Sequence, residues 1–238
     1  MWSGCGAGGL YYEKTPLSRL IEAAQSPILP ANLRQNIAII AWTRAVMLED
    51  AKSAAALVPL LPKDLGVTAQ TTSGLPALVT ILRNDGIQPV LNHGIARVAS
   101  FNQFDQYSDN GWCALGRTPQ SSGDNSLPRP VLPQPALFTP TEQQRAAAEY
   151  DHLKSLPDSQ DLIGQRVLTY AKAHPSDPLV PEALHFTVRA TRYGCRTYDP
   201  NIPWDQRPKF QLLSKSAFQL LHKNFPNSPW TAKTPYYF

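Results

Sequence analysis

Proline places the strongest constraint on how this chain can fold. The chain has 23 prolines among 238 residues, close to twice the average share of about 5%. Proline lacks the N–H that a strand ladder needs, so this content disfavours a central β-sheet. Proline is tolerated in the first turn of a helix, where the N–H has no intrahelical partner. The sequence therefore predicts an all-α fold, with helix-starting prolines at Pro16, Pro76, Pro140, Pro181 and Pro229.

Apolar residues recur at helical spacing between turn residues. Thr15-Pro16 predicts an N-cap followed by proline at the first helical position, and Leu17, Leu20 and Ala24 then share one face. We predict a helix from Leu17 and further helices over residues 31–50, 51–61, 75–83, 140–156, 158–174, 181–194 and 208–224. Thr139 and Glu142 form a capping box for the helix over 140–156. A less regular helix is predicted over 89–99, and a last short turn at Ser228-Pro229.

The helix predicted over residues 31–50 is apolar on nearly every side. Ile37 and Ile40 follow the helical period, while Trp42 and Val46 fall on the other sides. A helix of this kind is buried on two faces. Arg44 is the exception, since it is a charged residue within the apolar set.

The C-terminal helices carry apolar residues at helical spacing. One face of the helix over 158–174 holds Leu162, Ile163, Val167, Leu168 and Ala171, the inward residues of the next are Ala183, Leu184, Val188 and Thr191, and the apolar residues of the helix over 208–224 are Leu212, Leu213, Ala217, Leu220 and Leu221.

Residues 101–139 have no periodicity and carry five prolines. Segments of this length without secondary structure are uncommon inside a compact domain and are usually functional loops or linkers. The first part, up to Trp112, is aromatic enough to pack, whereas residues 117–135 are typical of an exposed, extended connection. We therefore predict an N-terminal helical layer over 1–100, a connecting segment over 101–139, and C-terminal helical repeats over 140–238.

One turn pattern occurs twice in the C-terminal part. Residues 170–179 (YAKAHPSDPL) align with residues 221–230 (LHKNFPNSPW) at an offset of 51 residues. In each copy the first proline ends a helix, Asp177 or Ser228 caps the next, and the second proline lies in its first turn. The pattern predicts the same tight connection between helices, used twice. Helix pairs stacked through such turns build an α-solenoid.

This turn resembles the helix connections of tetratricopeptide-like (TPR-like) helical-repeat proteins of the bacterial cell envelope. The resemblance covers residues 158–238, while residues 15–61 share only a general helical character. The offset of 51 residues exceeds the usual repeat of about 34, which would make the repeats irregular. The resemblance implies an irregular α-solenoid with a scaffold or partner-binding role and no catalysis, in the periplasm or at the outer membrane.

The net charge of +4 is concentrated at the C-terminal end. The chain has 22 Lys and Arg against 18 Asp and Glu. Residues 201–238 hold five of the former and only Asp205 of the latter, so the preceding residues hold 17 of each. Five cations spread over this length do not form a polybasic cluster. The pattern favours a solvated helix face over a nucleic-acid-binding one.

The sequence shows no membrane span and no visible targeting segment. No apolar run reaches the roughly 18 residues that a spanning helix needs. The start lacks the basic and apolar regions of a signal peptide. Because residues 1–10 are rich in glycine, we expect the chain to be a piece of a longer protein.

The three cysteines, Cys5, Cys113 and Cys195, make an odd count. Their spacing matches no zinc or haem motif, so we expect no metal and no cofactor. A disulfide between Cys113 and Cys195 would pin the connecting segment to a helix end in an oxidising compartment. Two buried free thiols are the alternative.

Residue types that carry catalysis are scattered, and we assign no catalytic residue. The five histidines include no metal-binding pair, and no phosphate loop or nucleophile elbow occurs. His174 occupies the aromatic position of the repeated turn, which predicts a packing role. His185 follows an inward leucine, which predicts a partly buried, hydrogen-bonded ring. Glu142, Glu149 and Asp151 share one helix, and the last two point to different faces.

Aromatic residues outside the predicted helix interiors are the best candidates for a partner surface. Rings of this kind often carry binding energy at interfaces, and filling gaps between irregular helices is the alternative. The candidate partner surface comprises Phe101, Phe104, Tyr107, Trp112, Trp204 and Trp230.

These patterns predict a non-catalytic helical-repeat scaffold that binds another protein or a missing part of its own chain. Only 17% of the residues are charged, and the apolar helices have more surface to cover than one domain easily hides. The alternative is an extracytoplasmic hydrolase in the helical groove, with Asp105, Asp109 and His93 in its site. A third possibility is a nucleic-acid-binding solenoid that acts through Lys215 and Lys223.

Overall fold

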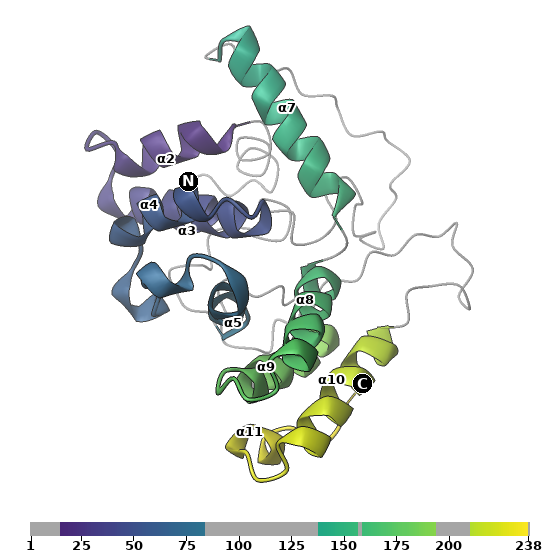
Figure 1. Ribbon diagram of the computed structural model, residues 1–238. Helices are drawn as coiled ribbons and strands as arrows, with labels where there is room; N and C mark the ends of the chain where they lie inside the picture. The colour runs from purple at the N-terminus through teal and green to yellow at the C-terminus, as the bar shows by residue number, and fades with distance from the viewer. Residues whose placement is uncertain (1–14, 84–137, 157–158, 194–209, 238) are drawn as a thin grey trace, which may run out of the picture.

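The computed structural model describes residues 15–83, 138–156, 159–193 and 210–237, and within them helices are the only regular elements (Figure 1). The predicted all-α class is confirmed. The N-terminal helices are α2 (Leu17–Gln25), α3 (Ala31–Met47), α4 (Ala51–Leu57) and α5 (Gly74–Arg83). The C-terminal helices are α7 (Pro140–Ser155), α8 (Ser159–Ala173), α9 (Val180–Tyr193), α10 (Phe210–Asn224) and α11 (Pro229–Ala232).

The N-cap of α7 was predicted correctly, whereas the N-cap of α2 was not. Thr139 and Glu142 form the predicted capping box of α7. In α2 the N-cap is Pro16 rather than Thr15, and no side chain of that residue caps the helix. A carboxylate oxygen of Glu149, on α7, instead accepts a 2.8 Å hydrogen bond from the N–H of Leu17. A carboxylate is favourable at a helix N-terminus, so α7 supplies the missing cap.

The helix predicted over residues 31–50 ends early, at Met47. Glu49 has a φ of 60°, a left-handed conformation that terminates helices. Asp50 then accepts a hydrogen bond of 3.0 Å from the N–H of Ser53 and caps α4. The following helix also ends before residue 61, because the proline in the 3₁₀ turn Val58–Leu60 cannot donate to the preceding turn.

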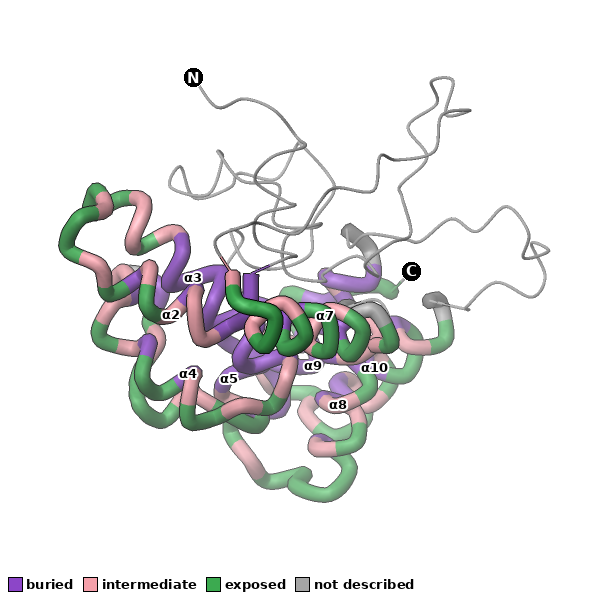
Figure 2. Tube along the Cα trace, turned by 90° about the horizontal axis from the view of Figure 1, so that it is seen from above, coloured by how far each residue is buried: buried purple, intermediate pink, exposed green. Residues whose placement is uncertain are grey.

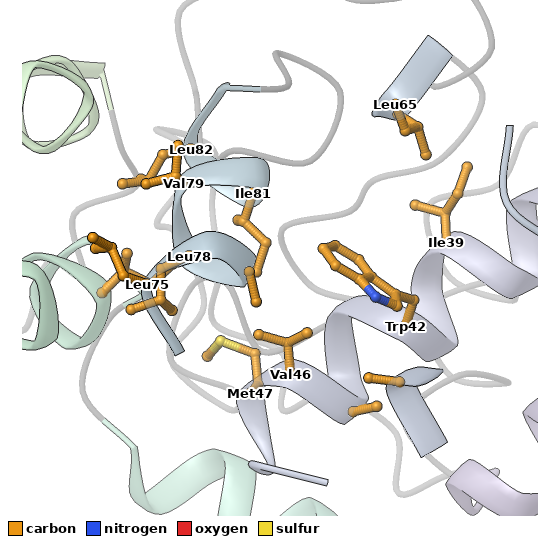
Figure 3. Packing of buried hydrophobic residues seen from close by; sticks show 14 of the residues in the cluster. Ile39, Trp42, Val46, Met47, Leu65, Leu75, Leu78, Val79, Ile81 and Leu82 are labelled. Atoms are coloured by element: carbon orange, nitrogen blue, oxygen red, sulfur yellow. The ribbon is translucent and has the colours of Figure 1, made fainter. Parts of the chain in front are cut away.

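Helix α3 lies at the centre of the N-terminal layer. Every residue from 37 to 47 is buried, and α2, α4 and α5 all pack against the helix (Figure 2). Figure 3 shows Trp42 and Val46 of α3 pointing toward α5. Arg44 is only 2% exposed and donates a 2.8 Å hydrogen bond to the carbonyl oxygen of Thr15. The prediction of a helix buried on two faces is confirmed.

Helices from the two ends of the sequence share one hydrophobic core. Helix α5 packs against both α8 and α9. Arg83 at the end of α5 donates two hydrogen bonds, of 2.8 and 2.9 Å, to the carboxylate of Glu182 in α9. Further ion pairs join Arg19 to Glu142 and Arg166 to Glu49. The predicted connecting segment 101–139 falls almost wholly outside the described residues, as does the helix predicted over 89–99.

The first copy of the repeated turn joins α8 to α9. The N–H of His174 donates to the carbonyl of Tyr170 at 2.8 Å, and the N–H of Asp177 donates to His174 at 3.2 Å. The Asp177 carboxylate accepts from the N–H of Leu179 at 2.8 Å and from the Tyr170 hydroxyl at 2.7 Å. The carbonyl of Asp177 accepts from the N–H of Val180 at 3.1 Å.

The second copy joins α10 to α11 through the same backbone bonds. Phe225 donates to Leu221 at 2.9 Å, and Ser228 donates to Phe225 at 3.0 Å. The Ser228 hydroxyl accepts from the N–H of Trp230 at 3.2 Å, and its carbonyl accepts from Thr231 at 3.0 Å. Each bond repeats its counterpart in the first copy at the offset of 51 residues. These backbone bonds confirm that one helix connection is used twice. The predicted place of the second proline holds only in the second copy, where Pro229 begins α11, because α9 begins at Val180, after Pro178.

The caps of the two turns give a measurable prediction. Asp177→Ala removes the bond to Leu179 and should lower the free energy of unfolding by about 1 kcal/mol, the usual worth of such a cap. Asp177→Ser keeps a capping oxygen and should recover most of that loss. Urea unfolding followed by circular dichroism measures both variants. Equal losses for Ala and Ser would contradict a capping role.

Helix α8 passes very close to its two neighbours at Gly164. A Cβ placed on this glycine would lie 2.7 Å from Cδ2 of Leu213 in α10 and 3.1 Å from Cγ2 of Thr187 in α9. The first distance is too short for two carbon atoms, and the second is tighter than an ordinary carbon contact. The absence of a side chain therefore permits α8, α9 and α10 to meet at one point.

Candidate functional site

Trp230 is the one residue of the predicted partner surface that lies within the described part of the chain. Its ring is half-buried, with its centre 5.1 Å from that of His185 and 5.5 Å from that of Phe186. The ammonium group of Lys233 lies 4.4 Å from the ring centre, within the range of a cation–π contact. Trp230 therefore helps to pack α11 on α9 and also carries a cation at the surface.

Two histidines form hydrogen bonds with Thr234, a buried residue just after α11. The Thr234 hydroxyl donates to the carbonyl of Trp230 at 2.7 Å, so its oxygen accepts from Nδ1 of His185, also at 2.7 Å. The carbonyl of Thr234 can only accept, so Nε2 of His222 carries the proton in their 2.8 Å bond. These bonds attach the chain after α11 to both α9 and α10. The predicted buried, hydrogen-bonded role of His185 is confirmed.

The surroundings of His185 favour its neutral form. Burial is the main cause, and the positive charges of Arg189 and Lys233 add to it. Together they lower the pKa of His185 to about 4. The ring therefore stays uncharged at neutral pH and serves as a donor to Thr234 rather than as a charged group.

This pKa predicts a loss of stability in mild acid. The unfolded ring titrates near pH 6.5, so below that pH protons bind the unfolded chain before they bind the folded one. The stabilisation is complete above about pH 6.5 and falls away as the pH approaches 4. Between pH 7.5 and 5 we expect His185 to account for a loss of about 2 kcal/mol in the free energy of unfolding.

Urea unfolding of the wild type and of His185→Gln at the two pH values measures this contribution. The variant should lose about 2 kcal/mol less than the wild type over the same interval. His152→Gln, at an exposed position on α7, is the matched control and should follow the wild type. An unchanged pH dependence in His185→Gln would contradict the assignment.

The outer face of α10 and the segment after α11 are apolar and basic. Leu212 belongs to the apolar set of the helix predicted over 208–224, but its side chain is 58% exposed. Leu212 falls in register with the exposed residues Lys215, Gln219 and Lys223, and the buried face is centred on Ala217 instead. Beyond α11, Tyr236 and Tyr237 are 53% and 40% exposed.

The other candidate histidine and the carboxylates of α7 make structural contacts. His174 is exposed, and its ring lies against that of Tyr170 with ring centres 4.3 Å apart. The N–H and hydroxyl of Thr139 and the guanidinium of Arg19 lower the pKa of Glu142 to about 2. Burial raises the pKa of Glu149, against the opposing effect of its bond to Leu17. Glu149 thus joins α7 to the backbone of α2, and Glu142 joins it to the guanidinium of Arg19.

Most of the residues singled out from the sequence lie outside the described residues. They are Phe101, Phe104, Tyr107, Trp112 and Trp204 of the candidate partner surface, Cys5, Cys113 and Cys195, and the hydrolase candidates Asp105, Asp109 and His93. The sequence analysis in turn missed His222 and Thr234. The pairing of Thr234 with His185 spans 49 residues and leaves no local pattern.

In the part of the chain that the structure describes, no three His, Cys, Asp or Glu side chains are grouped so as to hold a metal ion. None of the described helices combines the length and apolar character needed to cross a membrane. Neither a protein-family model, nor a curated protein, nor a solved structure matches the chain.

Proposed function

We propose that this chain is a non-catalytic helical-repeat scaffold that binds another protein in a larger extracytoplasmic assembly. The observation that carries the proposal is the helix connection repeated bond for bond around Asp177 and Ser228. A connection that recurs at a fixed offset defines a structural repeat. Such repeats stack into extended surfaces that are used for binding.

The packing of the C-terminal helices supports the repeat. Helix α9 packs against both α8 and α10, while α10 also reaches α8 and α11 reaches α9. In a solenoid of helix pairs, each helix contacts its partner and the corresponding helix of the next pair. The pair α8–α9 follows this scheme, and α10 stacks on both of its helices, whereas α11 packs on α9 rather than on α10. The N-terminal helices then cover α8 and α9 through α5.

The close approach at Gly164 gives a second argument for TPR-like packing. The tetratricopeptide pattern has Leu-Gly in its first helix, followed three residues after the glycine by a large ring. Ile163, Gly164 and Val167 occupy the corresponding places in α8, and Ile163 and Val167 are buried. Gly164 alone keeps the residue of the pattern: Gln160 replaces its tryptophan, Ile163 its leucine and Val167 its ring, which makes this repeat an atypical one. The proposed envelope location rests on the resemblance of the turn.

Purification of the tagged chain at its native expression level tests this function. We expect a second protein to co-elute in a fixed ratio through size-exclusion chromatography after gentle extraction of the cell envelope. The same tag on an unrelated envelope protein is the control. Recovery of the chain by itself as a monomer would contradict the scaffold role, and recovery from the cytosolic fraction would contradict the location.

A further inference from the structure

We propose that the outer face of α10, together with the rings beside it, binds an acidic segment of a partner protein that also carries an apolar residue. This inference rests on the proposed function and specifies its surface and the chemistry of its partner. We call this surface the α10 face and define it by Leu212, Lys215, Gln219, Lys223, Phe218 and Tyr237.

Four residues of the α10 face form a single stripe along the helix. Leu212, Lys215, Gln219 and Lys223 follow the spacing i, i+3, i+7, i+11, which places them on one side of a helix, and all four are exposed. The stripe therefore offers an apolar side chain at one end and two ammonium groups along its length. A partner with an apolar side chain could contact Leu212 while its acidic groups pair with Lys215 and Lys223.

The charged side chains of the segment that follows Asp205 are all basic. No Asp or Glu follows Asp205 in the sequence, so α10, α11 and the residues after them contain no carboxylate side chain. By contrast, Arg19, Arg83 and Arg166 all form ion pairs with glutamates elsewhere in the molecule. The two lysines of the α10 face therefore have no acidic residue in their own segment. Charge complementarity points to an acidic partner.

Aromatic rings next to the stripe are already fixed in place. Phe218 stacks on His222 with ring centres 4.0 Å apart, and Tyr237 packs on Phe218 at 5.2 Å. His222 is held in turn by its bond to the carbonyl of Thr234. Rings that are ordered before binding lose little entropy on association, and exposed tyrosines are frequent contributors at interfaces.

The balance of apolar and basic groups favours a peptide over a nucleic acid or a lipid surface. A nucleic-acid site at physiological salt usually engages about six to ten phosphates, whereas the α10 face presents two lysines. A membrane-surface helix needs a broad apolar face opposite its charges, whereas here Leu212 lies on the same side as the lysines. A short acidic and apolar peptide fits both features.

Selection from a phage library of random peptides of about twelve residues tests the inference on the full chain. Parallel selections use the wild type, the double variant Lys215→Glu with Lys223→Glu, and the control Lys52→Glu with Lys63→Glu. The control carries the same change of charge at two exposed lysines in the N-terminal half. Circular dichroism verifies that each variant keeps its helices. The strongest selected peptide is then synthesised and titrated against every form.

We expect peptides that bind the wild type to be enriched in Asp and Glu around a Leu, Ile or Phe. Their affinity should fall at least tenfold for the Lys215 and Lys223 variant and stay within about twofold for the control. Leu212→Ser should weaken binding several-fold without changing its salt dependence, because it removes an apolar contact only.

Two kinds of result would overturn the inference. Peptides of another composition, or peptides insensitive to the two lysines, would place binding elsewhere and leave the scaffold role intact. Binding of poly-uridine RNA or phosphatidylglycerol vesicles, with no acidic peptide selected, would assign the α10 face to a different class of partner. If no peptide is selected and no protein co-purifies from the native cell, the proposed function fails as well.

Discussion

Replacing Trp42 with alanine should lower the free energy of unfolding by about 4 kcal/mol, the largest effect that we expect from a single substitution in this chain. Trp42 is fully buried on α3, and Figure 3 shows its ring between α3 and α5. Removal of so large a side chain from a packed core leaves a cavity that the surroundings fill only in part. Chemical denaturation followed by far-ultraviolet circular dichroism measures the loss.

A matched variant separates packing from hydrogen bonding at the same position. Nε1 of Trp42 is buried and has no hydrogen-bond partner among the residues that the structure describes, which is a cost that the folded state already bears. Trp42→Phe removes this group while keeping an aromatic ring, so it should cost about 1 kcal/mol or less. If phenylalanine were as damaging as alanine, the indole N–H would have a stabilising role that the structure does not show.

The second large effect is expected at Gly164, where Gly164→Leu should lower the free energy of unfolding by about 3 kcal/mol. Even the first carbon of a side chain would meet Leu213 and Thr187 at distances below normal contact. Overpacking of this kind forces neighbouring side chains or helices to move. Thermal and urea unfolding would both report the loss.

Compensation at Leu213 provides the control for this prediction. Gly164→Ala gains helix propensity but presses on the flexible end of Leu213, so its net effect should be small. Combined with Leu213→Ala, the alanine at position 164 should be better tolerated than it is alone, with a coupling energy of about 1 kcal/mol. Additive effects in the double variant would contradict direct contact between α8 and α10.

The elements that could be predicted from the sequence are those whose determinants lie close together along the chain. The capping box at Thr139, the cap at Ser228 and the turn at Asp177 each involve residues within a few positions of one another. The all-apolar character of α3 likewise predicted its burial. These local signals established the all-α class and the repeated connection.

The features that could not be predicted depend on distant partners or on the rotational phase of a helix. The cap of α2 comes from Glu149, whose sequence neighbours give no sign of it, so Thr15 was the natural but wrong candidate. Leu212 fits an apolar period but lies outside the buried face of α10, which is centred on Ala217. Thr234 has no pattern of its own and becomes significant only through His185 and His222.

The cap that Glu149 provides for α2 also sets an order of events during synthesis. Leu17 leaves the ribosome 132 residues before its carboxylate partner, an interval on the order of ten seconds at ordinary elongation rates. Glu182, which binds Arg83, follows it by 99 residues. Throughout this time α2 and α5 have their contacts with α3 but lack those with α7 and α9. The N-terminal layer is therefore completed last by residues translated late, and a nascent chain stalled before α7 would expose it to proteases and chaperones.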